Sequence, residues 1–257
     1  MPSIAVLTAS RNAASTLPAL FETLKSQSLR DFEWIVVDGA STDGSVTLLN
    51  RFAREFDWVK WTSERDFGLY DALNKGLRRI QAPLYVVVGA DDRLAPDALA
   101  NYVALARSSG ADVILADVSI EGQRRGGFKP GRGWLSHAAV FRGSHSVGMA
   151  IRTALHSRFG EYSSRFPLLA DGLLLKTLVR AKDVRFFQAD FIAGDFSRGG
   201  MTGRRKAQIL AETWQIQLLT ERHPVLQTLL FLGKLLLRMP AVVHEVHAEV
   251  HANRSRT

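Results

Sequence analysis

The sequence predicts an α/β fold: a mostly parallel sheet flanked by helices, with a helical extension at the C-terminus. Three observations predict it. Strand-like and helix-like segments alternate through the first half of the chain, the strand-like segments are short apolar runs, and residues 203–239 are rich in leucine at helical spacing. Alternation of this kind is typical of parallel sheets that are covered by helices on both faces.

The expected elements follow one another in a regular order. Strands are predicted at 3–9, 33–38, 58–62, 84–88 and 112–117, where β-branched and aliphatic residues gather. Helices are predicted at 15–27, 45–56, 68–80 and 96–108, with Ser15 as the N-cap of the first and a turn at 39–44. After residue 117 the pattern is irregular. A hairpin or Gly/Arg-rich loop is expected at 119–134, a helix at 168–181, and one or two more helices at 203–239.

Composition limits the function classes. The chain has 257 residues and no cysteine, which excludes disulfides and thiolate chemistry. The start, MPSIAVLTASRN, lacks a basic n-region, so we expect no signal peptide and a cytoplasmic protein. Residues 225–243 come nearest to a membrane span, but Lys234 and Arg238 interrupt them, and a span needs about 20 apolar residues.

Charge is unevenly distributed. Residues 1–121 carry 12 Lys and Arg against 16 Asp and Glu, a net charge of −4, whereas residues 122–257 carry 21 against 9, a net charge of +12. A basic second half predicts an anionic partner: a phosphorylated substrate, acidic lipid headgroups or nucleic acid. Because no nucleic-acid recognition motif accompanies the charge, we expect no nucleic acid.

Polar side chains stand where the predicted strands end, and the carboxyl ends of such strands are where open α/β sheets bind ligands. Crowded carboxylates repel one another, and a divalent cation such as Mg²⁺ or Mn²⁺ compensates them. The alternative for Asp91 or Asp92 is that it caps the helix near Pro96. The candidate residues are Thr8, Ser10, Arg11, Asp38, Glu64, Asp66, Asp91 and Asp92.

Two phosphate-binding motifs are missing. No G-x-G-x-x-G follows the first strand, so a nicotinamide or flavin dinucleotide site is not expected, and no G-x-x-x-x-G-K-[ST] occurs, so a P-loop is excluded. Substrate phosphates must therefore meet a metal and Arg or Lys side chains.

Three blocks in order resemble one family. VLTASRNAASTLPALFETLKSQSLRDFEWIVVDGASTDGS is similar to the opening of family 2 glycosyltransferases, SERDFGLYDALNKGL to their next block, and GADD to their acidic metal motif. The second block is similar to that of a bacterial polysaccharide-biosynthesis subgroup, the colanic-acid-type transferases. The resemblance covers residues 3–200 and implies the Rossmann-like GT-A fold. It implies a nucleotide-sugar-binding half at 1–117, an acceptor half at 118–200, and an extension at 201–257.

The resemblance also implies roles. It implies inverting transfer of a sugar from a nucleotide-diphosphate sugar to a hydroxyl on a glycan or lipid-linked acceptor, with Mn²⁺ or Mg²⁺. Asp92 is the expected direct metal ligand and Asp91 touches ribose or metal, while Asp171, at the start of a helix, is the expected general base. Where the family has Pro-x-Tyr-Asn, this chain has Ala9-Ser10-Arg11-Asn12. The residues expected around the donor are Thr8, Ser10, Arg11, Asp38, Glu64, Asp66, Asn74, Asp91, Asp92 and Arg198; His145 matches the family's His-Gln block.

The C-terminal segment carries a second expectation. Gln227, Lys234 and Arg238 share one face of a predicted helix, and leucines fill the rest. Such a helix suits peripheral contact with an anionic membrane surface, on its inner face, and suits equally well packing on the catalytic domain or on a second subunit as a homodimer.

Two rival functions share these features. A sugar nucleotidyltransferase has the same type of sheet and acidic site. Its first loop, however, is normally rich in glycine and basic residues, and the corresponding segment of this chain, TASRNAAST, is not. A non-catalytic sugar- or lipid-binding module would not need an intact set of acids at the strand ends.

Overall fold

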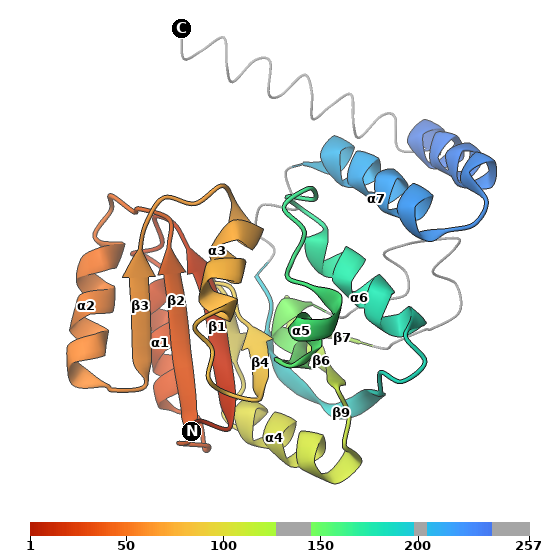
Figure 1. Cartoon of the computed structure of the whole chain (residues 1–257). Helices are drawn as coiled ribbons and strands as arrows, with labels where there is room; N and C mark the ends of the chain where they lie inside the picture. Colours follow the sequence, from red (N-terminus) through yellow and green to blue (C-terminus); the bar gives the residue numbers. More distant parts are fainter. Residues whose placement is uncertain (127–144, 198–204, 238–257) are drawn as a thin grey trace, which may run out of the picture.

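A computed structural model describes residues 1–126, 145–197 and 205–237, with the side chain of Lys206 left out. These residues form one nine-stranded sheet with helices on both faces (Figure 1). Eight strands follow one another across it in the order β3 (Val59–Ser63), β2 (Phe32–Asp38), β1 (Ile4–Ser10), β4 (Leu84–Val87), β8 (Met149–Arg152), β6 (Val113–Ile120), β9 (Phe186–Asp195) and β5 (Arg93–Leu94), while β7 (Gln123–Arg125) pairs with β6.

The first four strands of this order are parallel, as predicted. β1 pairs with β2 and β4, and β2 pairs with β3, in each case in parallel. The register sets Ser10 beside Asp38 and Asp38 beside Ser63, so the strands end together at one edge. The polar residues after strands far apart in sequence are therefore collected on that edge.

Beyond β4 the sheet is mixed. β8 runs antiparallel to both β4 and β6, β9 runs parallel to β6 with two register shifts, and β5 runs antiparallel to β9. The sequence reading did not predict β5, β8, β9 or the short helix α5 (Leu155–Phe159). The hairpin predicted at 119–134 begins as expected, since β6 and β7 meet at Glu121 and Gly122, both of positive φ.

Helices cover both faces. α1 (Leu17–Lys25), α2 (Ser45–Glu55) and α4 (Ala98–Ser109) pack on one apolar cluster, and α3 (Leu69–Leu77), α5 and α6 (Ala170–Arg180) pack on the other. α3 comes especially close to the sheet, because a Cβ on Gly76 would lie 2.3 Å from Leu7 Cδ1. The predicted N-cap at Ser15 is wrong: α1 begins at Leu17 with Thr16 at the N-cap. The N-cap of α4 is Asp97, so neither Asp91 nor Asp92 caps that helix.

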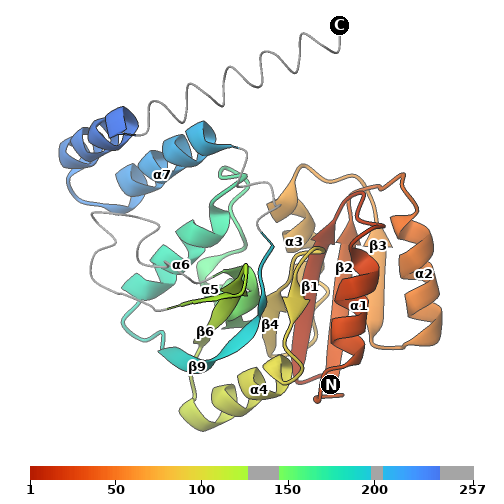
Figure 2. The ribbon, with the colours of Figure 1, turned by 180° about the vertical axis from the view of Figure 1, so that it is seen from behind.

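The C-terminal extension contributes two described helices, α7 (Lys206–Thr220) and residues 224–237, which lie side by side beyond α6 in both views (Figures 1 and 2). Among the described residues, every helix is too short or too polar to cross a bilayer. Arg198, Arg204, Arg238 and the histidines after residue 240 lie outside the described residues.

Candidate active site

The candidate site lies at the edge where β1, β2, β3 and β4 end and where α3 and α6 begin (Figure 1). Four chain segments bring acids to it: the ends of β2 and β3, the loop after β4, and the first turn of α6. The convergence predicted from the strand ends is thus present in the fold.

Asp38 ties this edge together. Its side chain is fully buried. One carboxylate oxygen accepts the hydroxyls of Ser10 and Ser41, and the other accepts the Ser41 N–H at 2.9 Å and the Ser63 hydroxyl at 2.7 Å. An ionised carboxylate has about four acceptor positions, and all are used. Asp38 therefore holds the ends of β1 and β3 and the turn after β2 in fixed relative positions.

The loops after β1 and β2 are joined by further hydrogen bonds. Asn12, in the left-handed region at φ 51°, donates its N–H to Ser41 Oγ and accepts the Thr42 N–H at 2.9 Å on its side chain. The next residues donate their N–H groups to Ser45 and Asp43. Asn tolerates this conformation better than most residues. One wall of the site is thus preorganised by polar side chains of these two loops.

The hydroxyl of Thr8 is used inside the protein. It donates to Val88 O at 2.9 Å and accepts the Trp34 indole N–H at 3.0 Å, in a fully buried position. The Thr8 side chain therefore packs in the core on the α1/α2 side of β1, and the expected place of Thr8 around the donor stays a prediction.

Arg11 and Asp66 meet over Gly39. A Cβ on Gly39 would lie 2.2 Å from Asp66 Oδ2 and 3.5 Å from Arg11 Cδ. Asp66 Oδ1 also accepts the Gly68 N–H at 3.0 Å, which fixes it at the start of α3. Glu64 lies further out, 3.7 Å from Lys75 and about half exposed. Arg11 and Asp66 are thus brought together at the site, and Glu64 stands at its rim.

Asp91 and Asp92, here called the acidic pair, converge on Gly89. A Cβ on Gly89 would lie 2.9 Å from Asp92 Oδ2 and 3.0 Å from Asp91 Oδ1, so only glycine leaves both carboxylates room. Asp92 accepts the Gly89 N–H at 3.0 Å and the Ser197 N–H at 2.9 Å, one on each oxygen. Burial, with a contribution from the charge of Asp91, raises the pKa of Asp92 to about 6.

This donor set fits a hard divalent cation. Two carboxylates held close together at a partly open edge are typical of Mg²⁺ and Mn²⁺ sites that leave positions for substrate oxygens. Within the described ranges, no group of three or more His, Cys, Asp or Glu side chains is placed to hold a metal ion. Because both oxygens of Asp92 already accept backbone N–H groups, the partly exposed Asp91 is the more accessible ligand of the two.

Asp171 stands in the first turn of α6. Its Oδ1 accepts the Tyr70 hydroxyl at 2.7 Å and the Gly172 N–H at 2.7 Å. Desolvation by the surrounding protein raises the pKa of Asp171, and the hydrogen bonds from Tyr70 and Gly172 partly offset that rise. Burial raises the pKa of Tyr70 well above its usual value, so Tyr70 stays a proton donor. Tyr70 on α3 therefore holds the Asp171 carboxylate, and Asp66 lies just before the same helix.

Two further residues position the start of α6. Glu212 on α7 is buried and accepts the N–H groups of Leu168 and Leu169 on one oxygen, each at 3.0 Å. Asn74 exchanges two hydrogen bonds with the backbone of Tyr162, at 2.8 and 3.0 Å. Asn74 thus anchors the segment before α6, and its expected donor contact stays a prediction.

Tyr70, Ser197 and Glu212 are not among the site residues predicted from the sequence. Tyr70 stands inside the quoted block SERDFGLYDALNKGL, but nothing in that block indicates that its partner lies after residue 160. Arg198 lies outside the described residues. The His145 ring stacks on Phe196 at 3.9 Å between centroids, which gives it a packing role beside Ser197.

The sequence is similar to known glycosyltransferases. The sequence model of glycosyl transferase family 2 matches residues 5–160, more than half of the chain. A PGL/p-HBAD biosynthesis glycosyltransferase of Mycobacterium tuberculosis is 29% identical over 174 residues, which cover 66% of this chain and 67% of the relative. A cholesterol galactosyltransferase of Borreliella burgdorferi is 28% identical over 109 residues, covering 42% of this chain and 30% of that protein.

Solved structures show the same fold. A mannosyltransferase of Pyrobaculum calidifontis in complex with GDP-Man and Mn²⁺ matches 100% of this chain and 76% of its own, with a TM-score of 0.65 and 20% identity. Residues 1–349 of S. aureus TarS in complex with UDP-GlcNAc match 90% of this chain and 70% of their own, with a TM-score of 0.66 and 15% identity. The predicted GT-A fold class is thereby confirmed.

Proposed function

Because the chain belongs to glycosyl transferase family 2, we propose that it transfers a sugar from a nucleotide-diphosphate sugar to a hydroxyl acceptor, with inversion and with help from a divalent metal. The acceptor class that we propose is a glycan or a lipid-linked glycan. The colanic-acid-type subgroup stays a prediction. Support for the donor comes from relatives of the same fold that were solved with UDP-GlcNAc or GDP-Man.

The acidic pair would hold Mn²⁺ or Mg²⁺. When bound, the cation supplies positive charge that stabilises the departing nucleoside diphosphate. Asp91 and Asp92 fit this task because both carboxylates converge on Gly89 at an edge that parallel strands leave open for a ligand. Arg11 and Asp66, which meet over Gly39, would border the nucleoside on the β1–β2 side.

Asp171 would act as the general base. An inverting transfer needs a carboxylate that takes the proton of the acceptor hydroxyl while that oxygen attacks the anomeric carbon, and such catalysis contributes typically 10²–10⁴-fold. The observation that carries the proposal is the hydrogen bond from Tyr70 to Asp171 at 2.7 Å, which joins the first turn of α6 to the helix that follows Asp66. The raised pKa of Asp171 improves it as a proton acceptor.

Nucleoside diphosphate release tests this proposal. Purified protein would be incubated with UDP-, GDP- and dTDP-sugars, with and without Mn²⁺, and with a bacterial lipid extract as acceptor. We expect one donor to release nucleoside diphosphate only when both Mn²⁺ and acceptor are present. Pyrophosphate formation from a sugar phosphate and a nucleoside triphosphate would instead indicate a nucleotidyltransferase, and silence across all donors would indicate a binding module.

A further inference from the structure

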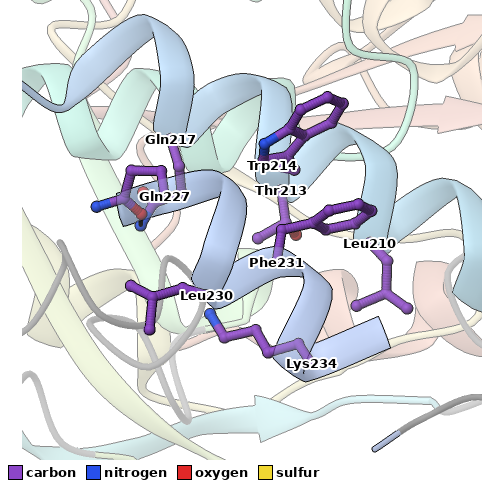
Figure 3. A pocket seen from close by; sticks show the side chains of 8 residues that line it. All are labelled: Leu210, Thr213, Trp214, Gln217, Gln227, Leu230, Phe231 and Lys234. Carbon is purple, nitrogen blue, oxygen red and sulfur yellow. Dashed lines mark hydrogen bonds between the residues drawn. The ribbon is translucent and has the colours of Figure 1, made fainter. Parts of the chain in front are cut away.

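The helix at residues 224–237 turns polar as well as apolar side chains toward the protein. A surface helix normally turns its apolar stripe inward and its polar side chains to water. Here polar side chains face α7: Gln227 is buried, Gln217 donates to it at 3.2 Å, and Trp214 Nε1 donates to Thr228 Oγ1 at 3.3 Å. The Phe231 ring stacks on the Trp214 ring, with 4.9 Å between the centroids. Gln227, Leu230, Phe231 and Lys234 line one small pocket together with residues of α7 (Figure 3).

The opposite face of the same helix is apolar and open. Positions i, i+4, i+7 and i+11 carry Val225, Leu229, Leu232 and Leu236, which fall on one face at 3.6 residues per turn. Between residues 224 and 237, all the residues that are exposed to solvent are apolar. We call the large exposed side chains among them the outward stripe. It consists of Val225, Leu226, Leu229, Leu232, Leu236 and Leu237, which are between 40% and 85% exposed.

Positive charge gathers around the start of this helix and on its α7 side. Glu221 is paired with Lys176 at 2.7 Å and with Arg180 at 3.2 Å, and Lys234 lies close enough to affect Lys176 electrostatically. Two of these cations therefore share the Glu221 carboxylate, and Arg222 adds an exposed positive charge just before the helix. We call Lys176, Arg180, Arg222 and Lys234 the basic cluster. An apolar face with basic neighbours is the pattern that binds the surface of an anionic bilayer.

Packing on α7 decides how such contact is made. Gln227 and Thr228 are bonded to Gln217 and Trp214 of α7, so one side of the described helix stays on the protein. The helix would thus lie along the membrane interface, with its outward stripe among the acyl chains. A second copy of the chain would also bury the stripe, but pairing two such helices would bring the two basic clusters together.

We propose that the outward stripe of residues 224–237 docks this protein on a membrane surface that contains anionic lipid. The docking helix is joined to the candidate site, because it packs on α7 and α7 holds the start of α6 through Glu212. Docking would thereby set Asp171 at a fixed distance from the bilayer. The proposal does not depend on sugar transfer.

Vesicle flotation tests it with the full chain. Phosphatidylcholine vesicles with and without 30% phosphatidylglycerol, on the order of the anionic content that attracts basic protein surfaces, would be mixed with wild type and with Leu229→Asp/Leu236→Asp. We expect wild type to float with the anionic vesicles and the double variant to bind about tenfold or more weakly, since two exposed leucines lose their burial. The matched control is Thr47→Asp/Asn50→Asp, which adds the same charge to the exposed face of α2 and should bind like wild type.

The other outcomes overturn the proposal. Equal flotation of wild type and double variant would exclude the outward stripe as the docking surface. Equal binding to vesicles with and without phosphatidylglycerol would exclude the basic cluster. Absence of flotation, together with a dimer in light scattering that Leu229→Asp/Leu236→Asp dissociates, would assign the stripe to a second copy. Because both altered side chains point away from α7, circular dichroism should show an unchanged fold.

Discussion

Glu212 links the C-terminal extension to the candidate active site, and replacing it by alanine tests that link. In the wild type, Oε2 of Glu212 accepts the N–H groups of Leu168 and Leu169 immediately before α6, and Oε1 accepts Gln208 Nε2 at 2.9 Å. Alanine removes the acceptor and leaves both backbone donors without it. The start of α6, where Asp171 stands, then loses its anchor on α7.

The size of the effect follows from these two donors. A buried donor left without a partner costs about 1–3 kcal/mol, which gives about 2–6 kcal/mol for two. Leu168 is buried, but Leu169 is partly exposed, and water can replace part of its bond. We therefore expect Glu212→Ala to lower the free energy of unfolding by about 2–4 kcal/mol, a large share of the roughly 5–15 kcal/mol of an ordinary domain.

Urea unfolding followed by far-ultraviolet circular dichroism measures this change. Glu212→Gln keeps an acceptor oxygen and should cost less, about 1–2 kcal/mol, because only the charge of the acceptor is lost. Glu22→Ala, on the exposed side of α1, is the matched control and should stay within about 0.5 kcal/mol of wild type. If Glu212→Ala also stayed within that range, α7 would not hold α6 through these hydrogen bonds.

Three further changes address the site. Asp171→Asn keeps the shape and the Oδ1 acceptor of the side chain but removes the base, so kcat should fall about 10²–10⁴-fold with an unchanged melting temperature; a smaller loss would remove Asp171 from the chemistry. Tyr70→Phe removes a hydrogen bond that lowers the pKa of Asp171, so that pKa should rise further above its usual value. The acid limb of the pH profile of kcat/KM should therefore move to higher pH. An unchanged pH profile would contradict this role of Tyr70. Gly89→Ala would push against both carboxylates of the acidic pair and should weaken nucleoside diphosphate binding in Mn²⁺ by about tenfold or more, whereas Gly233→Ala, with open space around it, should not.

The first half of the fold could be predicted because local signals and topology agree there. β1 to β4 are apolar runs separated by amphipathic helices, and parallel strands end at the same edge. The placement of Asp38, Asp66 and the acidic pair after strands that end at one edge therefore followed from the order of elements alone. β8 and β9 gave no such signal. β8 is only four residues long, and β9 has register shifts against β6 that break its two-residue alternation of burial.

The candidate site was predictable only in part for a related reason. Tyr70 and Asp171 are 101 residues apart, and Ser197 and Asp92 are 105 apart, so no spacing pattern joins them. The hydrogen bonds of the Thr8 hydroxyl to Trp34 and Val88 O inside the core could not be predicted either, since its place near a strand end does not show which way its side chain points. The exposed apolar face of the helix at 224–237 could not be predicted, since the sequence shows an amphipathic segment but not which side faces α7.

Calorimetric titration of UDP, GDP and dTDP tests the central claim most directly, namely that the acidic pair binds a diphosphate through a divalent cation. We expect at least one of the three to bind wild type in Mn²⁺ and not in EDTA, and to lose measurable binding in Asp91→Asn. Asp57→Asn, an exposed acid at the opposite edge of the sheet, should bind like wild type. Equal affinity with and without Mn²⁺, or unchanged affinity in Asp91→Asn, would contradict the account.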